Sequence, residues 1–480
     1  MKRKSITTNY IYNMLYQILV LITPIITTPY LSRVLGAQGI GIFSYAQSIA
    51  AYFILFGTVG SSLYGQREIA YVQDKIEDRT RVFWEINILR FITSIISIVI
   101  FYFSFVLHTE YSIIYKILII EILANMIDIT WYFQGVEDFS KVFYRNLFIK
   151  IIGIVMIFTL VKTKDDLLLY TLCYALALFL GNLTLWPTAI RSMKKVHGIK
   201  ISNHVKPLLI FFIPQIATEV YTVLDKTMIG VLASSIDEVG FYSQAQKLVK
   251  MTLCVVSSLG TVMLSAMARE YQKNNMQGII NSVLKSYRFV FFTGVPMMFG
   301  IIGISKNFCP WFFGPGFESV TLILALLAPI IVIIGLSNVT GRQFLLPTKK
   351  QTEFTISVVL GAVVNFCANF LLIPRYNALG AVVGTLLAEI SVTAIQFFFV
   401  KKEIHIKTLV KMSIIYFVSG ILMCISVTLI GNLMPSSIVT FAIQAIVGCL
   451  VYVGILAFFK DDMLKYAVET VKKKINRENA

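Results

Sequence analysis

Charged side chains recur inside long apolar stretches of this 480-residue chain, where a membrane-spanning helix would bury them. A charge at that depth costs a few kcal/mol on insertion scales, so it persists where it lines a wet cavity, forms a pair or lies near an interface. Cationic members of the set suit an anionic ligand such as a phosphate group, because they donate charge-assisted hydrogen bonds. The cationic candidates for substrate binding are Arg33, Arg90, Lys150, Lys226, Lys247 and Lys250.

Acidic side chains occupy the same stretches and suggest a second kind of chemistry. An intramembrane carboxylate can take up a proton or a metal cation, which would couple transport to an H+ or Na+ gradient. The candidates for ion coupling are Asp128, Glu219, Asp225 and Glu389. Simpler roles stay open. Arg90 and Lys150 could extend to the cytoplasmic interface, and Asp225 could pair with another helix.

The composition indicates which elements hold these side chains. Hydrophobic residues make up 57% of the chain and charged residues 14%, against about 45–50% and about 25% in an ordinary soluble domain. A soluble enzyme of one or two domains is therefore excluded. The apolar runs are continuous instead of alternating, which predicts transmembrane helices of about 20 residues each. We expect an all-α polytopic membrane protein.

Fourteen stretches have the length and hydrophobicity of a membrane span. They lie near residues 8–32, 40–64, 82–107, 112–134, 146–161, 167–190, 207–231, 240–264, 286–304, 318–340, 354–373, 379–400, 412–430 and 438–459. The first stretch follows a basic tripeptide, but it contains two prolines and has no convincing cleavage site. We therefore interpret it as a retained span and not as a signal peptide.

Lysine and arginine are distributed unevenly between the two sides of these spans. Of the 42, the segments on the side of both termini carry 31, those on the opposite side carry 6, and 5 lie within spans. Cytoplasmic loops of membrane proteins collect Lys and Arg, so both termini are predicted to lie in the cytoplasm. The net charge of +17 is then mostly a consequence of topology, and no nucleic-acid partner is expected.

A seven-residue pattern occurs twice, six predicted spans apart. Residues 41–47 read GIFSYAQ and residues 240–246 read GFYSQAQ, each at the start of a span. An even number of intervening spans gives both copies the same orientation, and parallel six-helix repeats are an architecture of secondary transporters, with the site between the lobes. We predict an N-terminal lobe at 1–206, a C-terminal lobe at 207–407, and two further spans with a basic tail at 408–480.

Signatures of catalysis and metal binding are missing from the sequence. It has no HExxH, GxSxG or GxxxxGK[ST] motif, which disfavours a membrane enzyme. The six cysteines form no CxxC pair and are interpreted as apolar side chains of helices. Neither a metal nor another cofactor is expected. The histidines lie in predicted loops or at their edges, where we expect solvated side chains: His108, His197, His204 and His405.

Several short segments of the sequence have a distinctive composition. One is WYFQGVE at 131–137, followed by Arg145-Asn146, and the others are LSRVLG at 31–36, GQREIA at 65–70, DKTMIG at 225–230, EVGFYS at 238–243 and several segments within 361–381. Together they resemble motifs of a known family, the polysaccharide repeat-unit flippases, which form the oligosaccharide-lipid branch of the multidrug/oligosaccharidyl-lipid/polysaccharide exporter superfamily. The most specific match is WYFQGVE, which is similar to the junction between the fourth and fifth spans of these flippases.

The resemblance implies a flippase for undecaprenyl-diphosphate-linked oligosaccharide units, which feeds capsule, exopolysaccharide or O-antigen assembly. It also implies alternating access by a monomer in the cytoplasmic (inner) membrane, with membrane lipids, a polysaccharide polymerase and assembly proteins as partners. The cationic residues would then hold the diphosphate. Two alternatives stay open: a drug/cation antiporter or lipid II-type flippase of the same superfamily, and a membrane enzyme such as a polysaccharide polymerase.

Overall fold

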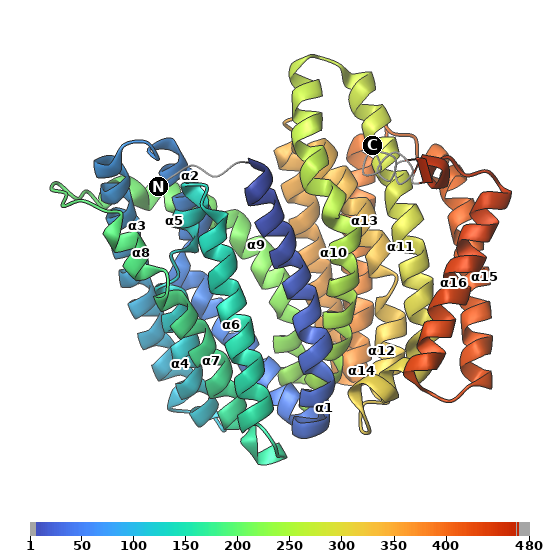
Figure 1. Ribbon diagram of the computed structural model, residues 1–480, viewed down its shortest axis with the longest axis horizontal. Helices are drawn as coiled ribbons and strands as arrows, with labels where there is room; N and C mark the ends of the chain where they lie inside the picture. The colour runs from blue at the N-terminus through green and yellow to red at the C-terminus, as the bar shows by residue number, and fades with distance from the viewer. Residues whose placement is uncertain (1–5, 467, 470–480) are drawn as a thin grey trace, which may run out of the picture. The chain divides into compact units, whose positions relative to one another are not determined.

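The protein is built from helices. The computed structural model describes residues 6–466, 468 and 469, and every regular element in this part of the chain is a helix (Figure 1). At some positions in the first half of α1 and in α9 and α10, the backbone is described without its side chain. The continuous apolar stretches therefore form the all-α architecture that their length predicts.

Short connections join consecutive helices. Two of the connections contain π-helical turns, at Tyr102–Val106 and Val339–Leu345, and a third contains a 3-10 turn at Lys164–Asp166. The α-helices are α1 (Ile6–Thr58), α2 (Ser61–Tyr71), α3 (Ile76–Phe101), α4 (Ser112–Met126), α5 (Thr130–Gly135), α6 (Phe139–Leu160), α7 (Leu167–Leu183), α8 (Trp186–Arg191), α9 (Ser202–Leu232), α10 (Asp237–Gln272), α11 (Met276–Phe313), α12 (Ser319–Leu327), α13 (Ile330–Asn338), α14 (Gln351–Val400), α15 (Ile406–Leu433) and α16 (Ile438–Phe458).

Two of these helices are each divided by one residue outside the helical region of backbone space. Gly36 divides α1 with φ at 69°, and Asn377 divides α14 with φ at 51°. Positive φ costs glycine little and is tolerated by asparagine more readily than by most residues. Each break therefore marks a turn between two spans. Each half of α1 and of α14 is therefore one span, and α12 and α13 together form another. The helices α2, α5 and α8 are too short to be spans. Counted in this way, the described chain has fourteen long helical segments, one at each predicted span.

The helices have the length and the surface of membrane spans. Nine segments of the described chain are long and apolar enough to cross a membrane, and two of them, Leu21–Tyr71 and Gln351–Val400, are 51 and 50 residues long. Large apolar side chains such as Ile95 and Ile96 of α3 are about half exposed. Such a surface is favourable in contact with lipid and unfavourable in contact with water. The chain is a multi-pass membrane protein.

The chain divides into two compact units. Unit 1 comprises Met1–Val231 with Ser235–Gly240, and unit 2 comprises Leu232–Ser234 with Phe241–Ala480. Helix α9 thus belongs to unit 1 up to Val231. The lobe boundaries that the sequence repeat suggests, after residues 206 and 407, stay a prediction.

Within unit 1, the end of α9 packs along the second half of α1. The hydroxyl oxygens of Ser48 and Thr227 lie 2.9 Å apart, so one donates a hydrogen bond to the other. A Cβ at Gly230 would lie 2.1 Å from the Tyr45 ring. The missing side chain of Gly230 is therefore what allows the two helices to approach this closely.

Unit 2 is held together by aromatic packing between α11, α15 and α16. The ring of Phe299 lies against Gly420 of α15, where a Cβ would be 2.5 Å from it. The Tyr452 hydroxyl of α16 donates to the carbonyl of Phe292 on α11 over 3.2 Å. The last two predicted spans, α15 and α16, therefore form part of the packed core of this unit.

Candidate functional site

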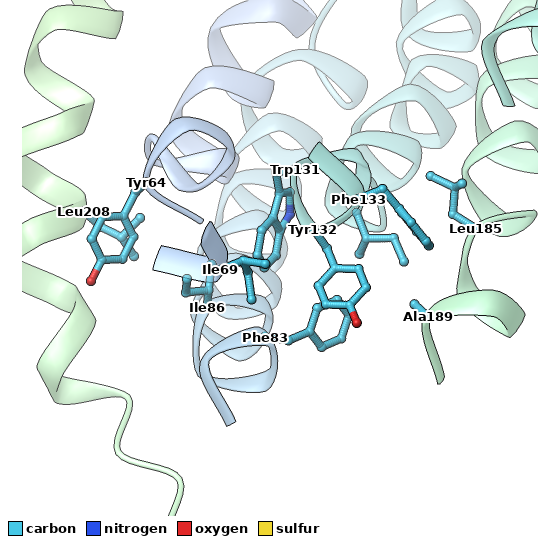
Figure 2. Close-up of a cluster of buried hydrophobic side chains, with 11 residues drawn as sticks. Tyr64, Ile69, Phe83, Ile86, Trp131, Tyr132, Phe133, Leu185, Ala189 and Leu208 are labelled. Atoms are coloured by element: carbon cyan, nitrogen blue, oxygen red, sulfur yellow. The ribbon is translucent and has the colours of Figure 1, made fainter. Parts of the chain in front are cut away.

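A buried core in unit 1 joins α2, α3, α5, α8 and the start of α9 (Figure 2). Residues 131–133 of α5 are completely buried. The Trp131 ring covers Gly65, where a Cβ would lie 2.5 Å from it, and a Cβ at Gly135 would lie 2.7 Å from the Cβ of Ile69. The GQREIA and WYFQG motifs thus pack directly on each other. Their glycines allow the contact, and the motifs act through packing.

Arg90 of α3 is the most completely buried of the six predicted cationic residues, with 2% of its surface exposed. Its Nη2 donates to the carbonyl of Asn125 on α4. Its Nε and Nη1 have no hydrogen-bond partner in the described part of the protein. Buried guanidinium donors are normally all paired, because each unpaired N–H keeps its desolvation cost. Arg90 therefore points into the helix packing, and two of its nitrogens are buried without a hydrogen-bond partner among the described residues.

A second arginine, Arg145 of α6, lies in the same group of helices. Its Nε donates to Oδ1 of Asn182 on α7 over 2.8 Å. Its Nη2 lies 3.7 Å from Oδ2 of Asp128, which forms an ion pair. Asp128 is also close enough to Arg90 for the two charges to attract. One carboxylate is therefore shared by two arginines.

Lys150 of α6 extends this group. It is partly buried and close enough to Arg145 for the two positive charges to repel each other. We call Arg90, Arg145, Lys150 and Asp128 the cationic cluster. Three positive charges against one negative charge leave a formal excess of two. This excess matches a ligand with about two negative charges, such as a diphosphate.

The other four predicted cations lie outside the cationic cluster. Arg33 is exposed and donates to the carbonyl of Pro29 in its own helix over 2.9 Å. Lys226 is partly buried in α9 of unit 1. Lys247 and Lys250 are exposed on α10 of unit 2, and the Lys247 ammonium donates to Gln244 over 3.0 Å. Of the six predicted residues, the structure brings Arg90 and Lys150 into one group.

The predicted acidic residues have different surroundings. Asp128 accepts a hydrogen bond from the backbone N–H of Thr130 over 2.9 Å and belongs to the cationic cluster. Asp225 in α9 and Glu389 in α14 are both buried. The side chain of Glu219 lies outside the described residues. A role of these residues in ion coupling stays a prediction.

Sequence reasoning missed Arg145 as a site residue. It was placed in a cytoplasmic segment before the fifth span, whereas α6 begins at Phe139 and already carries it. Its position beside Asn146 in a motif shared with the family was the available signal. The described residues contain no group of three or more His, Cys, Asp or Glu side chains suited to a metal ion.

The expectation of a solvated side chain is wrong for His204, which is 7% exposed. Its Nδ1 lies 2.7 Å from the Tyr64 hydroxyl, and its Nε2 lies 2.8 Å from Oε2 of Glu85. The backbone N–H of Lys200 donates to the other oxygen of Glu85 over 2.6 Å. This chain of bonds ties α2, α3 and the start of α9 together. His204 is therefore a structural residue of unit 1.

Curated relatives point to polysaccharide transport. A protein of Escherichia coli (strain K12) named "Putative O-antigen transporter" is 22% identical over 406 residues, which cover 83% of this chain and 97% of the relative. A protein of the same name from Shigella dysenteriae is 23% identical over 383 residues, which cover 76% of this chain and 93% of the relative.

Solved structures of transporters share the fold. The lipid II flippase MurJ in an inward closed conformation superposes with a TM-score of 0.73 at 17% identity, over 95% of this chain and all of that chain. A multidrug resistance MATE family transporter of the MOP superfamily, inward-facing, gives a TM-score of 0.59 at 12% identity, over 82% of this chain and 99% of that chain.

The family itself is identified from the sequence. Residues 6–271, more than half of the chain, match the family described as polysaccharide biosynthesis protein. This stretch contains the two motifs that pack on each other in α2 and α5, and the whole cationic cluster. The resemblance inferred from those motifs is confirmed, and the chain belongs to the polysaccharide biosynthesis protein family.

Proposed function

We propose that the protein is a flippase that moves undecaprenyl-diphosphate-linked oligosaccharide repeat units from the inner to the outer leaflet of the cytoplasmic membrane. It works by alternating access and supplies units for a capsule, an exopolysaccharide or an O-antigen. Family membership and the names of the two relatives support the substrate class. The partners are the lipid-linked glycan, membrane lipids, and a polysaccharide polymerase with its assembly proteins.

The buried arginine with two unpaired donors is the observation that carries this proposal. A buried N–H group without an acceptor is unfavourable, and an anion that accepts from Arg90 Nε and Nη1 would remove that cost. These two donors lie on different sides of the planar guanidinium, so they would bind separate oxygen atoms of the anion. The positive excess of the cationic cluster therefore supports the binding of a diphosphate in unit 1.

The remaining predicted cations are further candidates for contact with the headgroup. Arg33, Lys226, Lys247 and Lys250 are placed on α1, α9 and α10, and each could offer a transient contact to phosphate as the protein changes conformation. Lysine suits this role because its ammonium is a flexible point charge, whereas arginine makes a directed pair. The isoprenoid tail stays in the lipid phase throughout.

The membrane potential supplies part of the driving force in this scheme. Moving one elementary charge through 100 mV is worth about 2.3 kcal/mol. A headgroup with two negative charges that leaves a negative interior would gain about 4–5 kcal/mol by the same rule. An H+ or Na+ gradient would add to this if one of the buried carboxylates titrates during the cycle.

Deletion of the gene in its host tests the proposed function. We expect loss of the surface polymer and accumulation of undecaprenyl-linked single repeat units on the cytoplasmic leaflet, both restored by the wild-type gene. Intact polymer with altered drug sensitivity would assign the protein to drug export instead. Single units on the outer leaflet would indicate a polymerase. Accumulation of lipid II would indicate that the protein transports this cell-wall precursor.

A further inference from the structure

A buried carboxyl group outside the cationic cluster has no assigned role. Glu121 of α4 is 5% exposed. Both of its described hydrogen bonds reach Oε1, from the Tyr174 hydroxyl over 3.3 Å and from Gln47 Nε2 over 3.5 Å. Its Oε2 is buried and has no hydrogen-bond partner among the described residues. One oxygen of the carboxyl group is thus shared by two donors, and the other is unoccupied by the protein.

The partners of Glu121 come from three different helices of unit 1. Gln47 lies on α1, Glu121 on α4 and Tyr174 on α7. Gln47 Nε2 also donates to the Tyr174 hydroxyl over 2.7 Å, which closes a ring of three polar groups. The Phe43 ring packs edge-on against Tyr174 with 5.3 Å between ring centroids. The ring of polar groups is therefore enclosed by apolar and aromatic surface.

In the described part of the chain, no cation pairs with this carboxyl group. None of the described ion pairs of the protein includes Glu121. Helix α4 packs against α1, α3, α7 and the π-helical turn at Tyr102–Val106. Two titratable groups of α7, Tyr170 and Tyr174, lie close enough to Glu121 to interact with its charge. The described cations on these elements and on α4 itself form no ion pair with Glu121: Arg33, Arg79, Arg81, Arg90 and Lys116. Arg90 donates to the carbonyl of Asn125 and is attracted to Asp128.

We propose that Glu121, Gln47 and Tyr174 form a proton-binding site of unit 1, in which Oε2 of Glu121 gains and loses a proton during transport. A buried carboxylate without a cationic partner is unfavourable, and protonation removes its charge. Protonation adds one O–H bond at Oε2 and leaves the two donors at Oε1 in place. The assignment of the proton site is independent of the proposed function, and only the role of the proton in transport rests on that function.

The donor pattern favours a proton over a metal cation at this site. Gln47 and Tyr174 direct an N–H and an O–H toward the carboxyl oxygen, whereas a hard cation needs several oxygen lone pairs directed at it. The nearby helix positions 118 and 122 carry buried aliphatic side chains, which offer no further ligand. These surroundings therefore suit one protonatable oxygen atom and not a coordinated metal cation.

Infrared difference spectroscopy of the full-length protein in lipid bilayers tests this site without a transport assay. A pH step in sodium-free buffer is expected to produce a carboxylic-acid C=O band in the wild type that is lost in Glu121→Gln. The matched control is Asp128→Asn, which removes an intramembrane carboxylate paired with Arg145 and should leave the band. Tyr174→Phe removes one donor to Oε1 and should move the band to higher frequency.

Three results would overturn the assignment. The first is a band that persists in Glu121→Gln, and the second is a band that Tyr174→Phe leaves at its wild-type position. The third is a band that disappears when sodium chloride replaces choline chloride at constant pH, which would identify a metal cation as the occupant.

The spectra are independent of the proposed function. If deletion of the gene left the surface polymer intact, the flippase proposal would fail while the infrared assignment would stand. In the complemented deletion strain, Glu121→Gln is expected to lose surface polymer at normal membrane abundance. Full polymer output from this variant, together with loss of its band, would separate the proton site from transport and would remove its proposed role in coupling.

Discussion

The backbones of Gly41 and Gly240 approach each other reciprocally. A Cβ at Gly41 would lie 2.2 Å from the carbonyl oxygen of Ile236, and a Cβ at Gly240 would lie 2.4 Å from the carbonyl oxygen of Ala37. Each carbonyl precedes the opposite glycine by four residues. These glycines begin the two copies of the repeated sequence pattern, and a two-fold relation between like segments produces this kind of mutual contact.

We expect alanine at either glycine to destabilise the protein, because a methyl group would overlap a carbonyl oxygen and force the helices apart. Overpacking of this kind costs about 1–3 kcal/mol. Thermal unfolding of purified Gly41→Ala and Gly240→Ala should show a lower Tm than the wild type. Gly454→Ala in α16 is the control, since nothing lies within 4 Å of its Cβ position. Equal Tm values for all three variants would contradict the close contact.

The number and order of the spans could be predicted from the sequence because a membrane helix carries its signal locally, in length and hydrophobicity. The breaks at Gly36 and Asn377 also depend on local features, because glycine and asparagine tolerate positive φ. The packing of Gly41 on Gly240 was not predicted, although the repeat that places both glycines was recognised. A repeated pattern shows that two segments are alike, and it does not show that they touch.

The side-chain contacts that were not predicted join distant segments of the chain. Glu121 is separated by 74 residues from Gln47 and by 53 from Tyr174. His204 is separated by 119 residues from Glu85. A single sequence shows which residues share one face of a helix. It does not show which faces of different helices contact each other. The hydrophilic flank around His204 therefore suggested solvent, while tertiary packing buries the ring.

The unpaired donors of Arg90 lead to a prediction about transport. We expect Arg90→Ala to lower the export of lipid-linked repeat units roughly 10- to 100-fold, the equivalent of about 1.5–3 kcal/mol for hydrogen bonds to a charged group. Arg90→Lys should be intermediate, since it keeps the charge and loses the directed N–H donors of the guanidinium. Surface polymer and lipid-linked intermediates in the complemented deletion strain measure both.

The exposed Lys195 provides the control for Arg90. Lys195→Ala removes one positive charge from the loop between α8 and α9 and should leave polymer output unchanged. Membrane abundance of each variant is measured by immunoblotting, so that loss of folding is separated from loss of binding. Wild-type output from Arg90→Ala at normal abundance would remove the cationic cluster from the proposed site.

The hydrogen-bonded chain through His204 predicts a structural effect at one end of α9. We expect His204→Phe to destabilise the protein by about 2–4 kcal/mol, because the buried Glu85 carboxylate and Tyr64 hydroxyl both lose a partner. His204→Gln should recover part of the loss. His197→Phe in the exposed loop is the matched control. A Tm for His204→Phe equal to that of the control would show that the buried chain adds nothing to stability.

The contact between Gly65 and Trp131 predicts that their substitutions are coupled. Gly65→Ala places a methyl group against the indole, 2.5 Å from its nearest carbon, and should cost about 1–3 kcal/mol. Trp131→Leu leaves a cavity in the aromatic core and should cost about 3–5 kcal/mol. In the double variant the methyl group enters the space that the ring has left, so the combined loss in stability should be smaller than the sum of the single losses. A double-mutant cycle of unfolding free energies measures this difference. Strict additivity would mean that the helices α2 and α5 shift independently, and that the two family motifs do not form one packed unit.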